Sequence, residues 1–74
     1  MSSEAQNILQ VLKTKGRGND NFVHFTEFGD AIVWEAGFVK DEVVRQAIRY
    51  LTENGYVIEF SVGLGLTERG KAAT

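Results

Sequence analysis

The sequence predicts an α+β fold in which a core of three helices packs against a small antiparallel β-sheet. Three observations lead to this class. Apolar residues recur at helical spacing in several segments, short aromatic and β-branched stretches interrupt them, and residues 54–70 have the pattern of a β-hairpin followed by a helix start. The 74 residues suit one compact domain, which we expect to span residues 1–74.

The first predicted helix begins at Ser3 and ends at Gly16. Ser3 has Gln6 three residues later, which is the arrangement of a capping box. The apolar residues that follow at helical spacing form one stripe: Ala5, Ile8, Leu9 and Leu12. We expect Gly16 to end the helix in the left-handed conformation, which glycine adopts easily.

A short strand and a second helix are predicted next. Residues 22–25 are aromatic and β-branched and follow a loop rich in Gly, Asn and Asp, which is typical of a strand. Thr26 stands at a capping position, so a helix is expected over residues 27–36, ended by Gly37. This helix would be apolar on nearly all sides, which indicates deep packing or contact with a partner.

The third helix has the clearest pattern and is expected over residues 40–54. Its core stripe contains Val44, Ala47, Ile48 and Leu51. On the opposite face, Asp41 stands four positions before Arg45, where opposite charges can pair. Arg49 stands four positions before Glu53, and we expect a second pair there.

The end of the chain predicts a β-hairpin and a short terminal helix. Strands are expected over residues 56–60 and 64–66, joined by a three-residue loop with Gly63 in the left-handed position. If Phe60 faces Leu64, one side of the hairpin is wholly apolar and carries Tyr56, Ile58, Phe60, Leu64 and Leu66. We expect this side to lie on the helices, with strand 22–25 completing the sheet and Thr67 beginning the terminal helix.

The segments AIRYLTENGYVIEF and GLGLTERGK carry a family resemblance. A helix that ends in Asn-Gly, an apolar strand, a turn, and a second strand running into Leu-Thr-x-x-Gly resemble the winged-helix (winged helix-turn-helix) family over nearly the whole chain. The resemblance implies a winged helix, with a three-helix core and a β-hairpin wing. In DNA-binding members of the family, the third helix enters the major groove and the wing touches the backbone or the minor groove.

Double-stranded DNA is therefore the first expected partner, with a role as a transcriptional regulator or accessory factor. The residues expected to contact DNA are Lys40, Arg45, Gln46 and Arg49 of the third helix, with Lys13, Lys15 and Arg17 as a further cationic edge. The simpler interpretation is that these charges are a solvated face and a favourable complement to a helix dipole. A net charge of −2, a hairpin tip without Lys or Arg, and the nearby Glu59 also count against DNA.

A protein-binding winged helix is the competing interpretation. Trp34, Phe38 and Val62 are the candidate contact residues, because they are large, apolar and not clearly on a core stripe. The partner would be a second copy of the chain or another protein. Alternatively, Trp34 and Phe38 cover the corner between the second and third helices.

A narrower resemblance points in the same direction. The aromatic strand running into TEF, the DEV opening of the third helix and the VIEF strand resemble the small winged-helix D protein associated with dissimilatory sulfite reductase. That family is acidic and of similar length. The resemblance implies a role in sulfite reduction, either through DNA or by contact with the reductase.

Catalysis, cofactors and membranes are not expected. The chain has no cysteine, and its one histidine, His24, has neither a nucleophile nor a second histidine nearby in the sequence. The GRG and GLG pieces lack the spacing of a phosphate-binding loop, so neither a reaction nor a small-molecule substrate is predicted. No apolar run approaches the roughly 20 residues that span a bilayer, which together with the absence of cysteine predicts a cytoplasmic protein.

Overall fold

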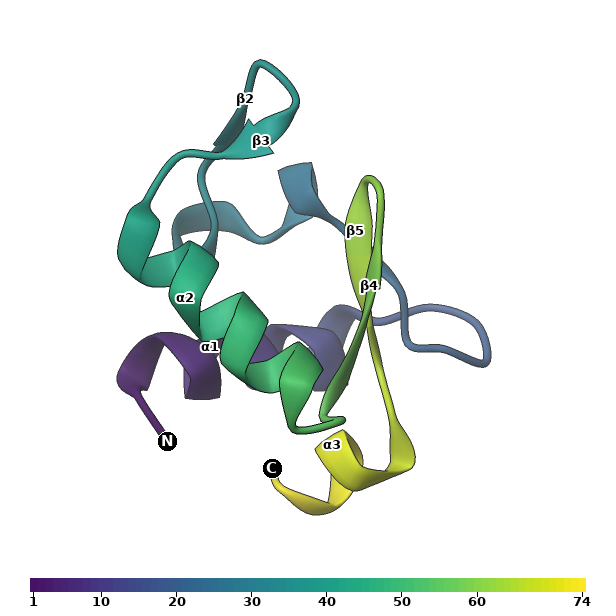
Figure 1. Ribbon diagram of the computed structural model, residues 1–74. Helices are drawn as coiled ribbons and strands as arrows, with labels where there is room; N and C mark the ends of the chain where they lie inside the picture. Colours follow the sequence, from purple (N-terminus) through teal and green to yellow (C-terminus); the bar gives the residue numbers. More distant parts are fainter.

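The computed structural model describes residues 1–74 and confirms the α+β class, with three α-helices and two small antiparallel sheets. The elements in chain order are α1 Ser3–Lys15, β1 Val23–His24, the 3₁₀ turns η1 Phe25–Glu27 and η2 Gly29–Ala31, β2 Trp34–Glu35, β3 Phe38–Val39, α2 Glu42–Glu53, β4 Val57–Phe60, β5 Gly63–Leu66 and α3 Glu68–Ala72. Figure 1 shows the β4–β5 hairpin standing beside α1 and α2, and the β2–β3 hairpin projecting at one end of the molecule.

Helix α1 follows the predicted range but differs at both ends. Its N-cap is Ser2, whose hydroxyl accepts a hydrogen bond from the N–H of Ala5 at 3.2 Å. Gly16 is extended, with φ −62° and ψ 144°, so the expected left-handed ending is wrong. Glycine is needed there for space, because a Cβ would collide with the Leu12 carbonyl oxygen and lie 2.6 Å from the Cβ of Asn21.

The predicted helix over residues 27–36 is absent. Gly29, inside this range, has φ +63°, which a right-handed helix does not contain. The segment forms η1 and η2 and then the β2–β3 hairpin, in which Trp34 pairs with Val39. Ala36 and Gly37 both have positive φ and make the two-residue turn, so Gly37 ends no helix. Between α1 and α2 there is therefore no α-helix that could form a helix-turn-helix pair with α2.

Helix α2 confirms the third predicted helix. Asp41 is its N-cap and accepts a hydrogen bond from the N–H of Val43 at 2.8 Å. The helix ends at the Asn-Gly pair, where Gly55 has φ +75°. Its buried residues are those of the predicted stripe: Val44, Ala47, Ile48 and Leu51.

The larger sheet has the strand order β1-β5-β4, which confirms that the early strand joins the hairpin. The predicted register is wrong by one residue, because Phe60 pairs with Gly63 and Glu59 with Leu64, leaving a two-residue turn. A one-residue shift turns a whole strand over. Val57 is consequently buried, while Ile58 and Phe60 are 38% and 36% exposed.

Two glycines of β5 explain where the outward aromatic rings lie. A Cβ on Gly63 would lie 2.6 Å from the Phe22 ring, and a Cβ on Gly65 would lie 3.1 Å from the Phe60 ring. The two rings meet edge to face, with centroids 5.4 Å apart. The outer face of β5 is thus covered by aromatic rings that only glycine can accommodate.

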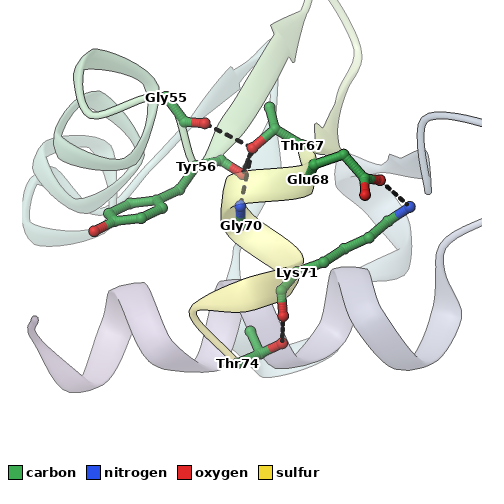
Figure 2. Close-up of polar contacts among 7 residues, drawn as sticks. All are labelled: Gly55, Tyr56, Thr67, Glu68, Gly70, Lys71 and Thr74. Atoms are coloured by element: carbon green, nitrogen blue, oxygen red, sulfur yellow. Dashed lines mark hydrogen bonds and ion pairs between the residues drawn. The ribbon is translucent and has the colours of Figure 1, made fainter.

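The terminal helix α3 is present and is fixed to the end of α2 by Thr67 (Figure 2). The Thr67 hydroxyl lies 2.6 Å from the Gly55 carbonyl oxygen and 3.0 Å from that of Tyr56, and it accepts a hydrogen bond from the N–H of Gly70. A Cβ on Gly70 would collide with the Tyr56 carbonyl oxygen. The Leu-Thr-x-x-Gly segment therefore packs α3 tightly against the backbone before β4.

The interior of the molecule is wholly apolar. Sixteen apolar residues form one buried cluster, and no polar or charged side chain is buried. Any binding chemistry must therefore lie at the surface. None of the helices has the length and apolar character required to cross a bilayer.

Candidate functional site

A groove of about 530 Å³ is lined by residues of α2, the end of β4 and the β2–β3 hairpin. Its apolar lining includes the aromatic residues Phe25, Trp34, Phe38 and Phe60. Its polar lining comes mainly from α2 and β4: Arg45, Arg49, Thr52, Glu53, Glu59 and Ser61. A concavity with an apolar wall and a few polar groups is typical of a binding site.

Two aromatic residues of the groove wall, Trp34 and Phe38, differ in how firmly they are held. Trp34 is half-buried and stacks on Phe25, with ring centroids 6.0 Å apart, while the His24 ring lies edge-on to it at 5.4 Å. Phe38 is 48% exposed, and the Nζ of Lys40 lies 5.0 Å from its ring centroid. The structure therefore brings the two predicted contact residues, Trp34 and Phe38, to the same groove.

Val62, the third predicted contact residue, lies elsewhere. It is 40% exposed in the turn of the β4–β5 hairpin and does not line the groove. Its carbonyl oxygen accepts a hydrogen bond from the N–H of Phe25 at 2.9 Å. The hairpin turn is thereby tied to the start of η1.

Arg45 is held by its own helix and the strand before it. Its Nη1 donates to the Val39 carbonyl oxygen at 2.9 Å, and its Nη2 bonds the Glu42 carboxylate. This hydrogen bond and the charge of Arg45 lower the pKa of Glu42 from its usual value. The predicted pair between Asp41 and Arg45 is therefore wrong, because Asp41 caps the helix and Arg45 binds Glu42.

Gln46 is also engaged, although more loosely. Its Nε2 lies 3.5 Å from the second carboxylate oxygen of Glu42, at the limit of hydrogen-bonding distance. Two of the side chains predicted to read DNA bases, Arg45 and Gln46, thus point their donors at Glu42.

Arg49 differs from Arg45 in having no partner. It lines the groove from the exposed face of α2 and makes neither an ion pair nor a side-chain hydrogen bond. The predicted pair with Glu53 is wrong, because no ion pair joins the two residues. A guanidinium with five free donors on the groove wall is available to an external acceptor.

The predicted cationic edge lies apart from the groove. Arg17 pairs with Glu27 at 2.9 Å, and together with Lys15 these residues surround a separate concavity. Figure 1 shows the loop after α1 on the opposite side of the molecule from the β2–β3 hairpin and the start of α2. The residues predicted to bind DNA therefore do not form one continuous face.

Sequence reasoning missed Glu59 and Phe60 as groove residues. The assumed register placed Phe60 in the core, although the structure puts it on the outer face beside the groove. The spacing of Gly63 and Gly65 was a signal for the outward position of Phe60. Two glycines at alternate positions leave one face of a strand without side chains, and rings from neighbouring residues can cover that face.

No family model, curated protein or solved structure matches this chain. A function therefore has to be inferred from the groove and its residues.

Proposed function

We propose that this chain is a protein-interaction module that binds a segment of a partner polypeptide in the groove between α2 and β4. The observation that carries this proposal is the apolar lining of the groove, in which Trp34 is half-buried and Phe38 is 48% exposed. Aromatic residues around a concavity are the usual anchors of protein interfaces. The resemblance to the sulfite reductase D protein supports the same class, since contact with the reductase is one of the two roles that it implies.

We also propose that the fold is a variant of the winged helix. The order α1, β1, α2, β4 and β5, together with the sheet order β1-β5-β4, supports this assignment. The turns η1 and η2 and the β2–β3 hairpin occupy the place in the chain where a second helix would stand. This replacement is what brings Trp34 and Phe38 to the groove.

DNA binding is the second candidate function, and the unpaired Arg49 on the exposed face of α2 favours it. Lys40, just before the N-cap of the same helix, would supply a phosphate contact. Three observations weigh against it: Arg45 and Gln46 are engaged by Glu42, the Ser61-Val62 turn is neutral, and the net charge is −2.

A selection for peptide binding, run beside a DNA-binding measurement, tests the two functions. Random peptides displayed on phage are selected against the full chain, and the selected peptides are titrated by fluorescence anisotropy. Phe38→Ser should weaken binding at least about tenfold, because it removes an exposed aromatic anchor. Val43→Ser is the matched control, because Val43 is an exposed apolar residue of α2 outside the groove.

The same variants are titrated with mixed-sequence duplex DNA at low and moderate salt. Peptide binding that is lost with Phe38→Ser and retained with Val43→Ser supports the protein-interaction module. Failure to select any peptide, together with salt-dependent DNA binding that Arg49→Gln weakens, would replace it with the DNA-binding function.

A further inference from the structure

The outer edge of β4 is unpaired beside the groove. β4 is the last strand in the order β1-β5-β4. The N–H of Leu66 in β5 bonds the Asp20 carbonyl oxygen at 2.7 Å, so Leu66 directs its hydrogen-bonding groups away from its partner Val57. Glu59, two residues after Val57, occupies the same kind of position opposite Leu64, and its N–H and C=O point away from β5.

This edge is accessible at Glu59. Glu59 is exposed and lines the groove, whereas Val57 is buried near the end of α2. One residue that presents both a donor and an acceptor on a free strand edge matches the backbone of a second extended chain. The groove therefore offers main-chain hydrogen bonds as well as aromatic contacts.

The charges of the groove favour a single acidic side chain on the occupant. Arg49 has no anionic partner, and an arginine fork binds a carboxylate through two parallel hydrogen bonds. Glu53 and Glu59 also line the groove, so a run of several acids would meet repulsion. Arg45 adds little attraction because Glu42 already neutralises it.

On the premise that the groove binds protein, we propose that its occupant is an extended segment of a partner protein that adds as a strand to the edge of β4 at Glu59. The segment places one Asp or Glu side chain on Arg49 and a large apolar side chain against Phe38. Backbone pairing holds the segment in place, and the two side-chain contacts select its sequence.

The peptides selected above provide the probe, synthesised with amidated C-termini and titrated into the isotope-labelled full chain. We expect them to share one acidic residue within two positions of a large apolar residue. At saturation, hydrogen exchange of the Glu59 amide should slow at least about tenfold, because that amide gains a backbone acceptor. Arg49→Gln should weaken binding by about tenfold or more, as expected for loss of a charged hydrogen-bonded contact.

Two controls isolate the carboxylate contact. Arg69→Gln removes an exposed arginine that lies over Tyr56 outside the groove, and it should leave affinity unchanged. A peptide with its acid changed to the amide should bind wild type and Arg49→Gln equally.

Peptides that bind the groove without protecting the Glu59 amide would overturn strand addition. Peptides that bind wild type and Arg49→Gln with equal affinity would overturn acid recognition. In both cases the protein-binding function would stand. Peptides that bind only with a free C-terminal carboxylate would overturn the internal acidic segment. If no peptide binds, the protein-interaction function itself fails.

Discussion

The imidazole Nδ1 of His24 accepts a hydrogen bond from the backbone N–H of Thr26 at 3.1 Å. In return, the Glu27 carboxylate accepts a hydrogen bond from the backbone N–H of His24 at 3.3 Å, which completes a capping box around η1. The same imidazole lies edge-on to Trp34 on the groove wall. His24 therefore fixes the turn that leads from β1 toward the aromatic wall, which is a structural role.

Two substitutions at His24 separate its capping hydrogen bond from its ring contact with Trp34. His24→Phe keeps an aromatic ring beside Trp34 but removes the acceptor, so we expect a loss of about 1 kcal/mol in the free energy of unfolding. His24→Asn places an oxygen where Nδ1 stands and should preserve the cap. Urea unfolding measures the stability, and hydrogen exchange at Thr26 reports the cap directly. Faster exchange at Thr26 in the Asn variant than in the Phe variant would contradict this account.

The stability of the fold should depend on the ionisation of Glu27. The hydrogen bond from the His24 backbone, and then the charge of Arg17, lower its pKa below the usual 4.5. A lowered pKa in the folded state means that Glu27 contributes stability above 4.5, and this contribution is lost as pH falls through the folded value. The free energy of unfolding of Glu27→Gln should therefore fall less steeply with decreasing pH than that of wild type.

The control for this pH dependence is Glu35→Gln. Glu35 lies exposed in β2 and forms no ion pair or side-chain hydrogen bond. This change should therefore leave the loss of unfolding free energy at low pH close to that of wild type. Urea unfolding at a series of pH values from 6 to about 3 gives the free energy of unfolding of wild type, Glu27→Gln and Glu35→Gln. If this free energy changes equally with pH in all three, Glu27 does not contribute.

Ala36 holds a strained backbone conformation in the β2–β3 turn. Its φ of +53° is left-handed, which costs a residue with a Cβ roughly 1–2 kcal/mol. Ala36→Asn gives the Asn-Gly pair that such turns prefer and should raise the free energy of unfolding by about 0.5–1 kcal/mol. Gly37→Ala, at φ +84°, should lower it. Chemical denaturation of both variants tests the turn, and a destabilised Ala36→Asn would contradict it.

The sequence was sufficient for the elements whose pattern is local. The stripe of α2 and its Asp41 and Gly55 ends were predictable, because helical period and capping chemistry act within a few residues. The pairing of β1 with the hairpin was also predictable, because two strands alone are marginally stable.

Two features of the groove could not be predicted in the same way. The segment around Ala36 has helical spacing of apolar residues, and only the left-handed Gly29 and the two-residue turn make it a hairpin. The register of β4 was ambiguous because Ile58 and Phe60 on one face and Val57 on the other are all apolar, so the pattern did not mark a core side. The groove depends on both features, and for that reason its residues were found only in part.

Gly70 is predicted to be essential for the docking of α3. A methyl group at this position would meet the Tyr56 carbonyl oxygen, which is backbone and cannot rotate away, and would lie 2.6 Å from the side chain of Leu66, a buried core residue. Gly70→Ala should therefore lower the free energy of unfolding by about 2–3 kcal/mol, although alanine favours helix formation. Lys71→Ala in the same helix removes only an exposed pair with Glu68 and should cost less than about 1 kcal/mol. If urea unfolding places Gly70→Ala at or above the stability of Lys71→Ala, then α3 does not pack on the Tyr56 backbone as described.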